Sequence, residues 1–352
     1  MLNLEDLLRK AIELGASDLH ITVGLPPTMR INGKLIPYGN GKLVPKDTEN
    51  YVKEMLDADQ YDEYIKTGEM DLSFSIQGVG RFRVNVFRQR GSDAIALRTV
   101  APQVPTLDKL GMPSVIKELT NKTRGLILVT GPTGSGKSTT LAAMINEINS
   151  TRSGHIITLE DPVEYLHKHK RSIVNQREIG HDSKSYANAL RAALREDPDV
   201  ILVGEMRDLE TISIAITAAE TGHLVLSTLH TVGASKTVDR IVDVFPPYQQ
   251  QQIKVQLSTV LEGVISQQLI TKANGEGRTC ALEIMTATPA IRNLIREGKT
   301  HQIDSAVQIG AKYGMKTMDM SLIELYKKGE ITYEDAMLYS VDSDVMMRML
   351  KL

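Results

Sequence analysis

The chain of 352 residues contains a single cysteine, Cys280, and this excludes an internal disulfide and a multi-cysteine zinc site. One cysteine is consistent with a reducing compartment. No apolar run approaches the ~20 residues that a helix needs to cross a bilayer. The opening stretch "MLNLEDLLRKAIELGASD" carries acids and a helical apolar stripe. We therefore expect a first helix closed by Gly15 and not a signal peptide.

Strong charge and stacking aromatics are also missing. The formal net charge is −2, aromatic residues make up 4% of the chain, and there is no tryptophan. The protein therefore has no global basic field that would recruit nucleic acid or anionic lipid. Hydrophobic residues (41%) and charged residues (24%) occur at the levels of a soluble globular protein. The length suits two domains or one large domain.

The chain shows two different sequence patterns, one after the other, and together they predict an α/β protein. Residues 1–99 alternate short helical and strand patterns, as an α+β domain does, and "VAPQVPTLDKLGMP" (100–113) has the prolines of a linker. From residue 114 to residue 352, short apolar runs alternate with helical patterns, which is typical of parallel strands buried on both faces. The four runs are 125–130, 155–160, 200–205 and 223–230. After residue 250 we expect a mainly helical tail.

A phosphate-binding loop follows the first of these runs. The segment "GPTGSGKS" matches G-x-x-x-x-G-K-[ST], in a strand–loop–helix context. Such a loop turns backbone N–H groups around a phosphate at a helix N-terminus, where negative charge is favoured. We expect Lys137 to reach the β- and γ-phosphates of ATP or ADP, and the Ser138 hydroxyl to bind Mg²⁺. The expected nucleotide-binding residues are Gly131, Pro132, Thr133, Gly134, Ser135, Gly136, Lys137, Ser138 and Thr139.

Acidic and polar residues follow three later strands. The segment "ITLEDPVEY" places Glu160, Asp161 and Glu164 after one of them, and Glu205 ends the next. Ligands of parallel sheets bind outside the carboxyl ends of the strands, so these acids are expected to face the triphosphate. Acids there are unfavourable unless they hold a metal or move a proton. After the third strand, Ser227, Thr228 and His230 are expected to sense the γ-phosphate.

The phosphate-binding loop and the segments at the later strand ends together resemble the motifs of one protein family. The segments "GPTGSGKSTT", "ITLEDPVEY", "ILVGEMRDLET" and "GHLVLSTLHT" are similar to the Walker A, aspartate, Walker B and histidine boxes of the type II/IV secretion ATPases. The segment "AIRNLIREGKTHQI" (290–303) resembles the signature of the pilus retraction branch. The resemblance covers essentially the whole chain.

The resemblance implies a fold and a set of roles. Family members are hexameric rings, and each nucleotide lies between an N-terminal PAS-like domain and a C-terminal RecA-like P-loop domain. Glu164 is then the general base, Glu205 holds Mg²⁺, and His230 links the phosphate to the next subunit. The ring is expected in the cytoplasm at the bacterial inner membrane, where it acts on the platform protein of the pilus. Paralogous ATPases are further expected partners.

Two further groups of residues receive expected roles. In "RFRVNVF", Arg81 and Arg83 share one face of a strand, and an arginine from outside the loop can stabilise phosphoryl transfer by ~10³–10⁵ in rate. The alternative is a charged edge strand that resists aggregation. The second group, at helical spacing in the branch signature, is either a core helix or an output motif that moves the platform protein. Its members are Ile291, Arg292, Leu294, Ile295 and Arg296.

Other functions remain open from the sequence. Within the family, the alternatives are the accessory retraction paralogue and the extension ATPase of pili or type II secretion. Extension ATPases usually carry an additional N-terminal domain and a four-cysteine element, and this chain starts at the expected PAS-like domain with one cysteine. A RecA-type nucleic-acid translocase would usually show a basic stripe or stacking aromatics. A regulatory module without turnover would not need both Glu164 and Glu205.

Overall fold

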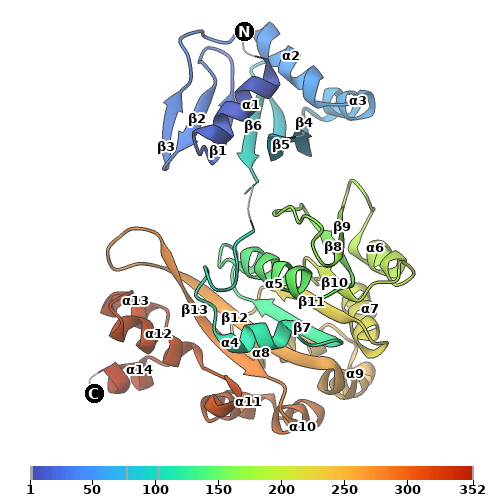
Figure 1. The fold of residues 1–352 in the computed structure, drawn as a ribbon, viewed down its shortest axis with the longest axis vertical. Helices are drawn as coiled ribbons and strands as arrows, with labels where there is room; N and C mark the ends of the chain where they lie inside the picture. The colour runs from blue at the N-terminus through green and yellow to red at the C-terminus, as the bar shows by residue number, and fades with distance from the viewer. Residues whose placement is uncertain (1–2, 77, 101–103, 351–352) are drawn as a thin grey trace. The chain divides into compact units, whose positions relative to one another are not determined.

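A computed structural model describes residues 3–76, 78–100 and 104–350, which form two compact units (Figure 1). Unit 1 is Met1–Gln103 and unit 2 is Val104–Leu352. Of the segment predicted as a linker, residues 101–103 lie outside the described residues. Residues 104–113 belong to unit 2, where Leu107 is fully buried in the core, so this part is packed.

Unit 1 is an antiparallel sheet with the strand order β3-β2-β1-β6-β5-β4, covered by three helices. The alternation of "RFRVNVF" is confirmed: Phe82, Val84 and Val86 are fully buried on the helix side of β5. The elements are α1 (Leu4–Glu13), β1 (Asp18–Ile21), β2 (Thr28–Ile31), β3 (Lys34–Pro37), α2 (Pro45–Met55), α3 (Ala58–Thr67), β4 (Glu69–Ile76), β5 (Gly80–Gln89) and β6 (Ser92–Thr99).

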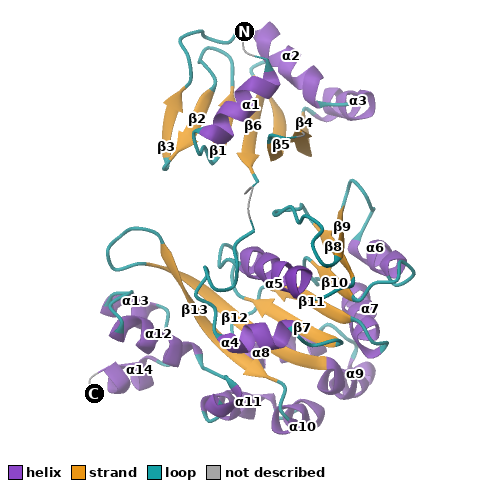
Figure 2. Ribbon diagram, in the orientation of Figure 1, coloured by secondary structure: helices purple, strands orange, loops and turns teal. Residues whose placement is uncertain are grey.

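Unit 2 is built on a seven-stranded sheet with the order β13-β12-β7-β11-β10-β8-β9 (Figure 2). The four predicted apolar runs form β7, β8, β10 and β11, which are parallel to one another. Its strands are β7 (Gly125–Thr130), β8 (His155–Glu160), β9 (Ile173–Glu178), β10 (Val200–Val203), β11 (Leu224–Leu229), β12 (Leu261–Thr271) and β13 (Arg278–Thr286).

Helices cover both faces of this sheet, because alternate strand residues face opposite cores. Along β7, Ile127 and Val129 pack against α4 and α5, whereas Leu126 and Leu128 pack in the core that contains α6 to α11. These helices are α4 (Ser114–Thr120), α5 (Lys137–Thr151), α6 (Tyr186–Ala193), α7 (Leu209–Glu220), α8 (Ala234–Asp243), α9 (Pro247–Val260), α10 (Pro289–Glu297) and α11 (Ile303–Gln308).

The prediction of a mainly helical chain after residue 250 is wrong for residues 261–286. These residues form the β12–β13 hairpin, and β12 lies beside β7 in parallel register (Figure 1). Polar residues Ser266 and Gln267 interrupt the apolar run of β12 although both are buried, and this hid the strand. The remaining helices pack at the far end of the hairpin: α12 (Met318–Lys327), α13 (Tyr333–Leu338) and α14 (Ser343–Leu350).

Among the described residues, none of the helices is both long and apolar enough to cross a membrane.

Candidate nucleotide site

The predicted phosphate loop connects β7 to the N-terminus of α5. Gly134 and Gly136 have φ angles of 78° and 87°, in the region that L side chains rarely adopt. Gly131 has no room for a side chain, because a Cβ there would collide with the backbone oxygen of Gln267 in β12. The glycines at these three positions are therefore required by the shape of the loop.

The Lys137 side chain folds over the loop. Its Nζ donates to the carbonyl oxygens of Gly131 and Pro132, each at 2.9 Å. Burial lowers the pKa of Lys137, and the carboxylates of Glu205 and Glu164 oppose this shift. Carboxylates from two different strand ends thus act on the same ammonium group, so the loop, Glu164 and Glu205 belong to one electrostatic site.

The segment with three acids is a braced turn. Glu160 accepts hydrogen bonds from Thr158 Oγ1 at 2.6 Å and Gln176 Nε2 at 3.1 Å, and burial raises its pKa. Gln176 of β9 also donates to the carbonyl oxygen of Tyr165 and accepts from the N–H of His167. One glutamine therefore holds both ends of the turn that carries Glu164.

The turn is also tied to the phosphate loop and to β9. The hydroxyls of Tyr165 and Thr139, in the first turn of α5, lie 2.9 Å apart. The backbone N–H of Val163 donates to the buried carboxylate of Glu178, at the end of β9. Glu164 and Asp161 remain exposed on this framework, so Glu160 shapes the turn while Glu164 projects from it.

Glu205 follows β10 and meets the end of β11. Its Oε1 lies 2.7 Å from Nε of Arg207, and its Oε2 lies 3.4 Å from Nε2 of His230. A hollow of about 660 Å³ lies here, lined by Thr133 of the phosphate loop and by Arg207, His230 and Arg240 among others. Three basic side chains and one residue of the phosphate loop line this hollow, and this lining favours an anionic ligand.

The two carboxylates differ in their partners. Both oxygens of Glu205 face basic side chains, whereas no hydrogen bond or ion pair to the Glu164 carboxylate occurs within residues 3–76, 78–100 and 104–350. Arg207 and His230 therefore fix the orientation of the Glu205 carboxylate, whereas the Glu164 carboxylate can turn towards a ligand. The chemistry available to the two acids therefore differs.

Ser227 and Thr228 were predicted to sense phosphate, but the structure gives them another role. Ser227 Oγ donates to the carbonyl oxygen of Val203 and Thr228 Oγ1 to that of Gly204, and both residues are buried. Their hydroxyls therefore fasten the end of β11 to the end of β10. Of the three residues predicted to sense phosphate, His230 lines the hollow beside the phosphate loop.

Three side chains at the site were missed by the sequence analysis. Gln267 of β12 donates to the carbonyl oxygen of Ser135 in the phosphate loop, Gln176 braces the acidic turn, and Tyr186 begins α6 beside Gly204. Burial raises the pKa of Tyr186, and the nearby Glu205, Asp161 and Glu160 raise it further. None of the three lies in a recognisable motif. For the two glutamines, a polar residue inside an otherwise apolar strand could have indicated a functional contact.

The oxygen groups near the loop fit a Mg²⁺ ion bound together with a nucleotide. Ser138 and Glu205 offer one hydroxyl and one carboxylate, and Mg²⁺ usually takes one or two protein oxygens and completes its shell with phosphate and water. The described part of the chain has no group of three or more His, Cys, Asp or Glu side chains that could hold a metal by itself.

The remaining predicted residues lie elsewhere. Arg81 and Arg83 lie on β5 of unit 1, and Arg83 is exposed. In α10, Ile291 and Ile295 are fully buried and Leu294 is partly buried. Arg292 is held within unit 2: it donates to the carbonyl oxygens of Ala287, Ser258 and Thr259 and pairs with Glu262 at 2.6 Å. Arg296 is exposed.

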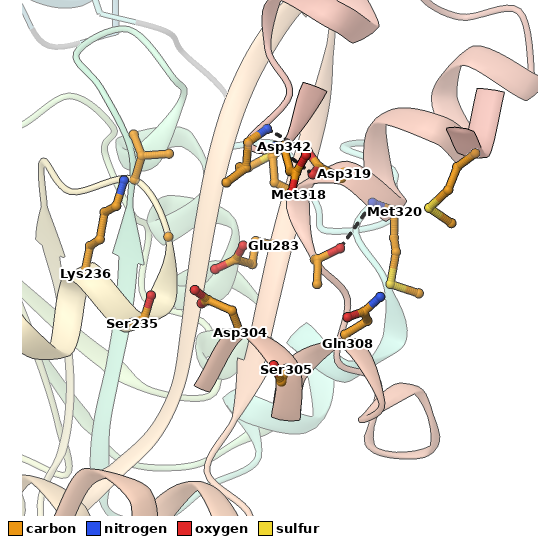
Figure 3. Close-up of a pocket in the computed structure, with 15 residues that line it drawn as sticks. Ser235, Lys236, Glu283, Asp304, Ser305, Gln308, Met318, Asp319, Met320 and Asp342 are labelled. Atoms are coloured by element: carbon orange, nitrogen blue, oxygen red, sulfur yellow. Dashed lines mark hydrogen bonds between the residues drawn. The ribbon is translucent and has the colours of Figure 1, made fainter. Parts of the chain in front are cut away.

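A second cavity, of about 330 Å³, lies between α8, β13, α11 and α12 (Figure 3). Its carboxylates hold the backbone of the surrounding helices. Glu283 accepts from the N–H of Ala234 at the start of α8, and Asp319 accepts from the N–H groups of Val341 and Asp342. Glu283 therefore fastens the start of α8 to the sheet, and Asp319 fastens α12 to the segment before α14.

Comparison with known proteins assigns the family. A sequence profile described as type II/IV secretion system protein matches residues 2–337. The chain belongs to the type II/IV secretion system protein family. Within this family, it is 50% identical to the type IV pilus retraction ATPase PilT of Pseudomonas aeruginosa, over 95% of this chain and 97% of that protein.

Two further matches place the chain within the family. It is 41% identical to the type IV pilus ATPase PilU of Pseudomonas aeruginosa, over 99% of this chain and 91% of that protein. A crystal structure of the pilus retraction motor PilT with bound ADP matches with a TM-score of 0.91 and 52% identity, over 99% of this chain and 100% of that one. The α/β fold with its two sheets is therefore that of a solved secretion ATPase.

The braced turn makes the stability of unit 2 dependent on pH. Burial and the charge of Lys170 lower the pKa of His167 from 6.5 to about 4. The unfolded chain therefore binds a proton at a higher pH than the folded chain, so stability is fully present above pH 6.5 and is lost as the pH falls towards about 4. We expect His167→Gln to reduce this loss, as measured by urea unfolding at several pH values.

The exposed His181 provides a matched control. His181→Gln replaces an exposed imidazole outside the braced turn, and unfolding it under the same conditions separates the effect of a buried histidine from that of losing a histidine. An unchanged pH dependence in His167→Gln would show that this histidine is protonated equally in the folded and unfolded chains, contrary to its burial.

Proposed function

We propose that this chain is a motor ATPase that hydrolyses ATP to power the retraction of type IV pili and thereby twitching motility. The observation that carries the proposal is the convergence of the phosphate loop, Glu164 and Glu205 on Lys137, in a fold that matches an ADP-bound pilus retraction motor. The proposed assembly is a homohexamer at the cytoplasmic side of the inner membrane, in contact with the pilus platform protein. Unit 1 is then the PAS-like domain and unit 2 the RecA-like domain.

The accessory role of PilU is the second candidate. The chain is 50% identical to PilT and 41% identical to PilU of the same organism, and this difference favours the retraction motor itself. The extension ATPase of type II secretion is disfavoured because the chain is only 30% identical to the type II secretion system protein E of Xanthomonas campestris, over 66% of that protein.

The residues of the site divide the work of ATP hydrolysis. The loop amides and Lys137 bind the phosphates, and Ser138 and Glu205 would hold Mg²⁺, which stabilises the charge that develops on the transferred phosphoryl group. His230 and Arg207, both against Glu205, keep that carboxylate at the end of β10. Glu164, exposed on its braced turn, accepts the proton of the attacking water.

The two acids can be separated by amide substitutions. Glu164→Gln keeps the size of the side chain but cannot accept a proton, so kcat should fall by ~10²–10⁴ while the affinity for Mg-ADP is kept. Glu205→Gln should weaken the binding of Mg-nucleotide more than that of nucleotide without metal. Phosphate release and titration with a fluorescent nucleotide measure the two effects, and Lys137→Ala serves as the variant without phosphate binding. Normal turnover in Glu164→Gln would show that another group is the base.

Arg81 and Arg83 are proposed to stabilise the transferred phosphoryl group across a subunit boundary. They share one face of β5, opposite the buried face. In that case, a subunit with both arginines replaced by alanine still has an intact phosphate loop. Mixed rings of this variant with Lys137→Ala subunits should regain turnover, because each supplies what the other lacks. If no mixture exceeds the activity of the two parents, the arginines do not act on a neighbouring subunit.

The helix α10 is proposed to transmit motion to the platform protein. Ile291 and Ile295 lie on its buried side. Arg292 donates a hydrogen bond to the last turn of α9 and forms an ion pair with Glu262. The exposed Arg296 is therefore the arginine of this motif that is available to a partner. No side chain of α10 appears among those that line the hollow beside the phosphate loop.

Arg296→Ala should therefore separate hydrolysis from retraction. We expect the purified variant to keep its hexamer and its turnover within a few-fold, while the strain carrying it is hyperpiliated and does not twitch, like a strain that lacks the gene. Arg292→Ala is the control, and it should lose stability because three carbonyl oxygens and one oxygen of Glu262 lose this donor. Loss of turnover and of the hexamer in Arg296→Ala would assign α10 to structural support. A deletion strain without pili would instead indicate an extension motor.

A further inference from the structure

The side chain of Gln267 lies within the core beneath the phosphate loop. Gln267 is 1% exposed, and its Nε2 donates to the carbonyl oxygen of Ser135 at 2.6 Å. A Cβ at Gly136 would lie 3.2 Å from the same nitrogen. The contact joins residues 132 positions apart in the chain, and it is possible because β12 runs parallel to β7 and Ser266 pairs with Thr130. Gln267 is therefore one residue beyond the end of β7, where the loop begins.

Packing of the core alone does not explain a glutamine at this position. Its Oε1 is buried and has no hydrogen-bond partner among the described residues, and the same holds for the hydroxyl of Ser135. An unpaired polar atom in the core is destabilising, and an apolar side chain of equal length would avoid it. The one favourable polar contact of this side chain is the bond to the loop.

That bond controls the direction of one peptide group. A trans peptide unit is planar, and its C=O and N–H point in opposite directions. With the carbonyl oxygen of Ser135 held towards β12, the N–H of Gly136 is held away from β12. The N–H groups of such a loop turn inward around the phosphate, so the fixed peptide presents one of its donors to the ligand.

We propose that Gln267 is a positioning residue for the nucleotide, which fixes the Ser135–Gly136 peptide so that the Gly136 N–H faces the β-phosphate. The inference rests on the proposed function, because it requires a nucleotide in the loop. Since ADP and ATP share the β-phosphate, the side chain contributes equally to the binding of both. It touches no reacting atom, so it affects binding more than the rate of the chemical step.

The first test replaces Gln267 by methionine, which has the same length but no N–H donor. We expect the Kd values for Mg-ADP and Mg-ATP to rise by the same factor, about three- to tenfold, the range that one net hydrogen bond allows. KM should rise by a similar factor and kcat should change less. The midpoint of thermal unfolding without nucleotide should change by no more than ~2 °C, because the lost bond is offset by removal of the unpaired Oε1.

Gln268→Met is the matched control. Gln268 is the next residue of β12 and points to the opposite face of the sheet, so its replacement should leave both Kd values unchanged. If Gln267→Met binds nucleotide as tightly as Gln268→Met, or lowers the unfolding midpoint without changing the shift that nucleotide adds, Gln267 only fills the core and the proposal is wrong.

A second variant keeps the proposal testable if methionine is not tolerated. In Gln267→Glu, a protonated carboxyl can donate to the carbonyl oxygen of Ser135, and an ionised one repels it. The ratio of its Kd for Mg-ADP to the wild-type Kd should therefore fall as the pH is lowered from about 8 to about 5.5, where a buried glutamate gains its proton. A ratio that stays constant, or a Gln267→Glu chain that also does not fold, would contradict a role specific to the loop.

Failure of the proposed function gives a different result. In that case the wild-type protein would not bind Mg-ADP, or Lys137→Ala would bind it equally well. Tight, lysine-dependent binding by the wild-type protein with no effect of either Gln267 substitution would overturn this inference alone.

Discussion

The parallel register of β12, β7, β11, β10 and β8 is the constraint on which the site depends. Thr130, the last residue of β7, pairs with Leu229 of β11 and with Ser266 of β12, and Val203 of β10 pairs with Leu159 of β8. The carboxyl ends therefore lie along one edge of the sheet. The phosphate loop, the acidic turn and the end of β10 follow three of these strands, and Glu164 and Glu205 both act on the charge of Lys137.

Buried polar side chains on these strands form hydrogen bonds that hold the neighbouring loops in position. Gln176 holds the acidic turn, and Gln267 holds the phosphate loop. On the same hairpin, Ser266 accepts from the N–H of Gly233 and Glu283 from that of Ala234, which fixes the start of α8 just after His230. The hairpin thus supports the loops on both sides of the phosphate. Such bonds cost stability when one partner is lost, so the loops and the core depend on each other.

The sequence predicted the loop, the strand-end acids and the two-part chain, because each depends on a local pattern. An apolar run of six residues predicts a buried strand, and the glycine spacing predicts the loop. The β12–β13 hairpin was missed because Ser266 and Gln267 are bonded to distant segments, and no local pattern records such contacts. For the same reason the sequence did not show that Arg292 is held by Ser258, Thr259 and Glu262. The alternation along β5 gave the face of Arg81 and Arg83 but not their partners.

Hydrogen exchange of the purified protein with and without Mg-ADP tests most directly the claim that one edge of the sheet binds the nucleotide. We predict slower exchange in the phosphate loop at 131–139, in the braced turn at 160–167 and in the segments after β10 and β11, at 204–207 and 228–233. The amides of α10 are expected to change little. Unchanged exchange at these strand ends, with protection elsewhere in unit 2, would contradict the account.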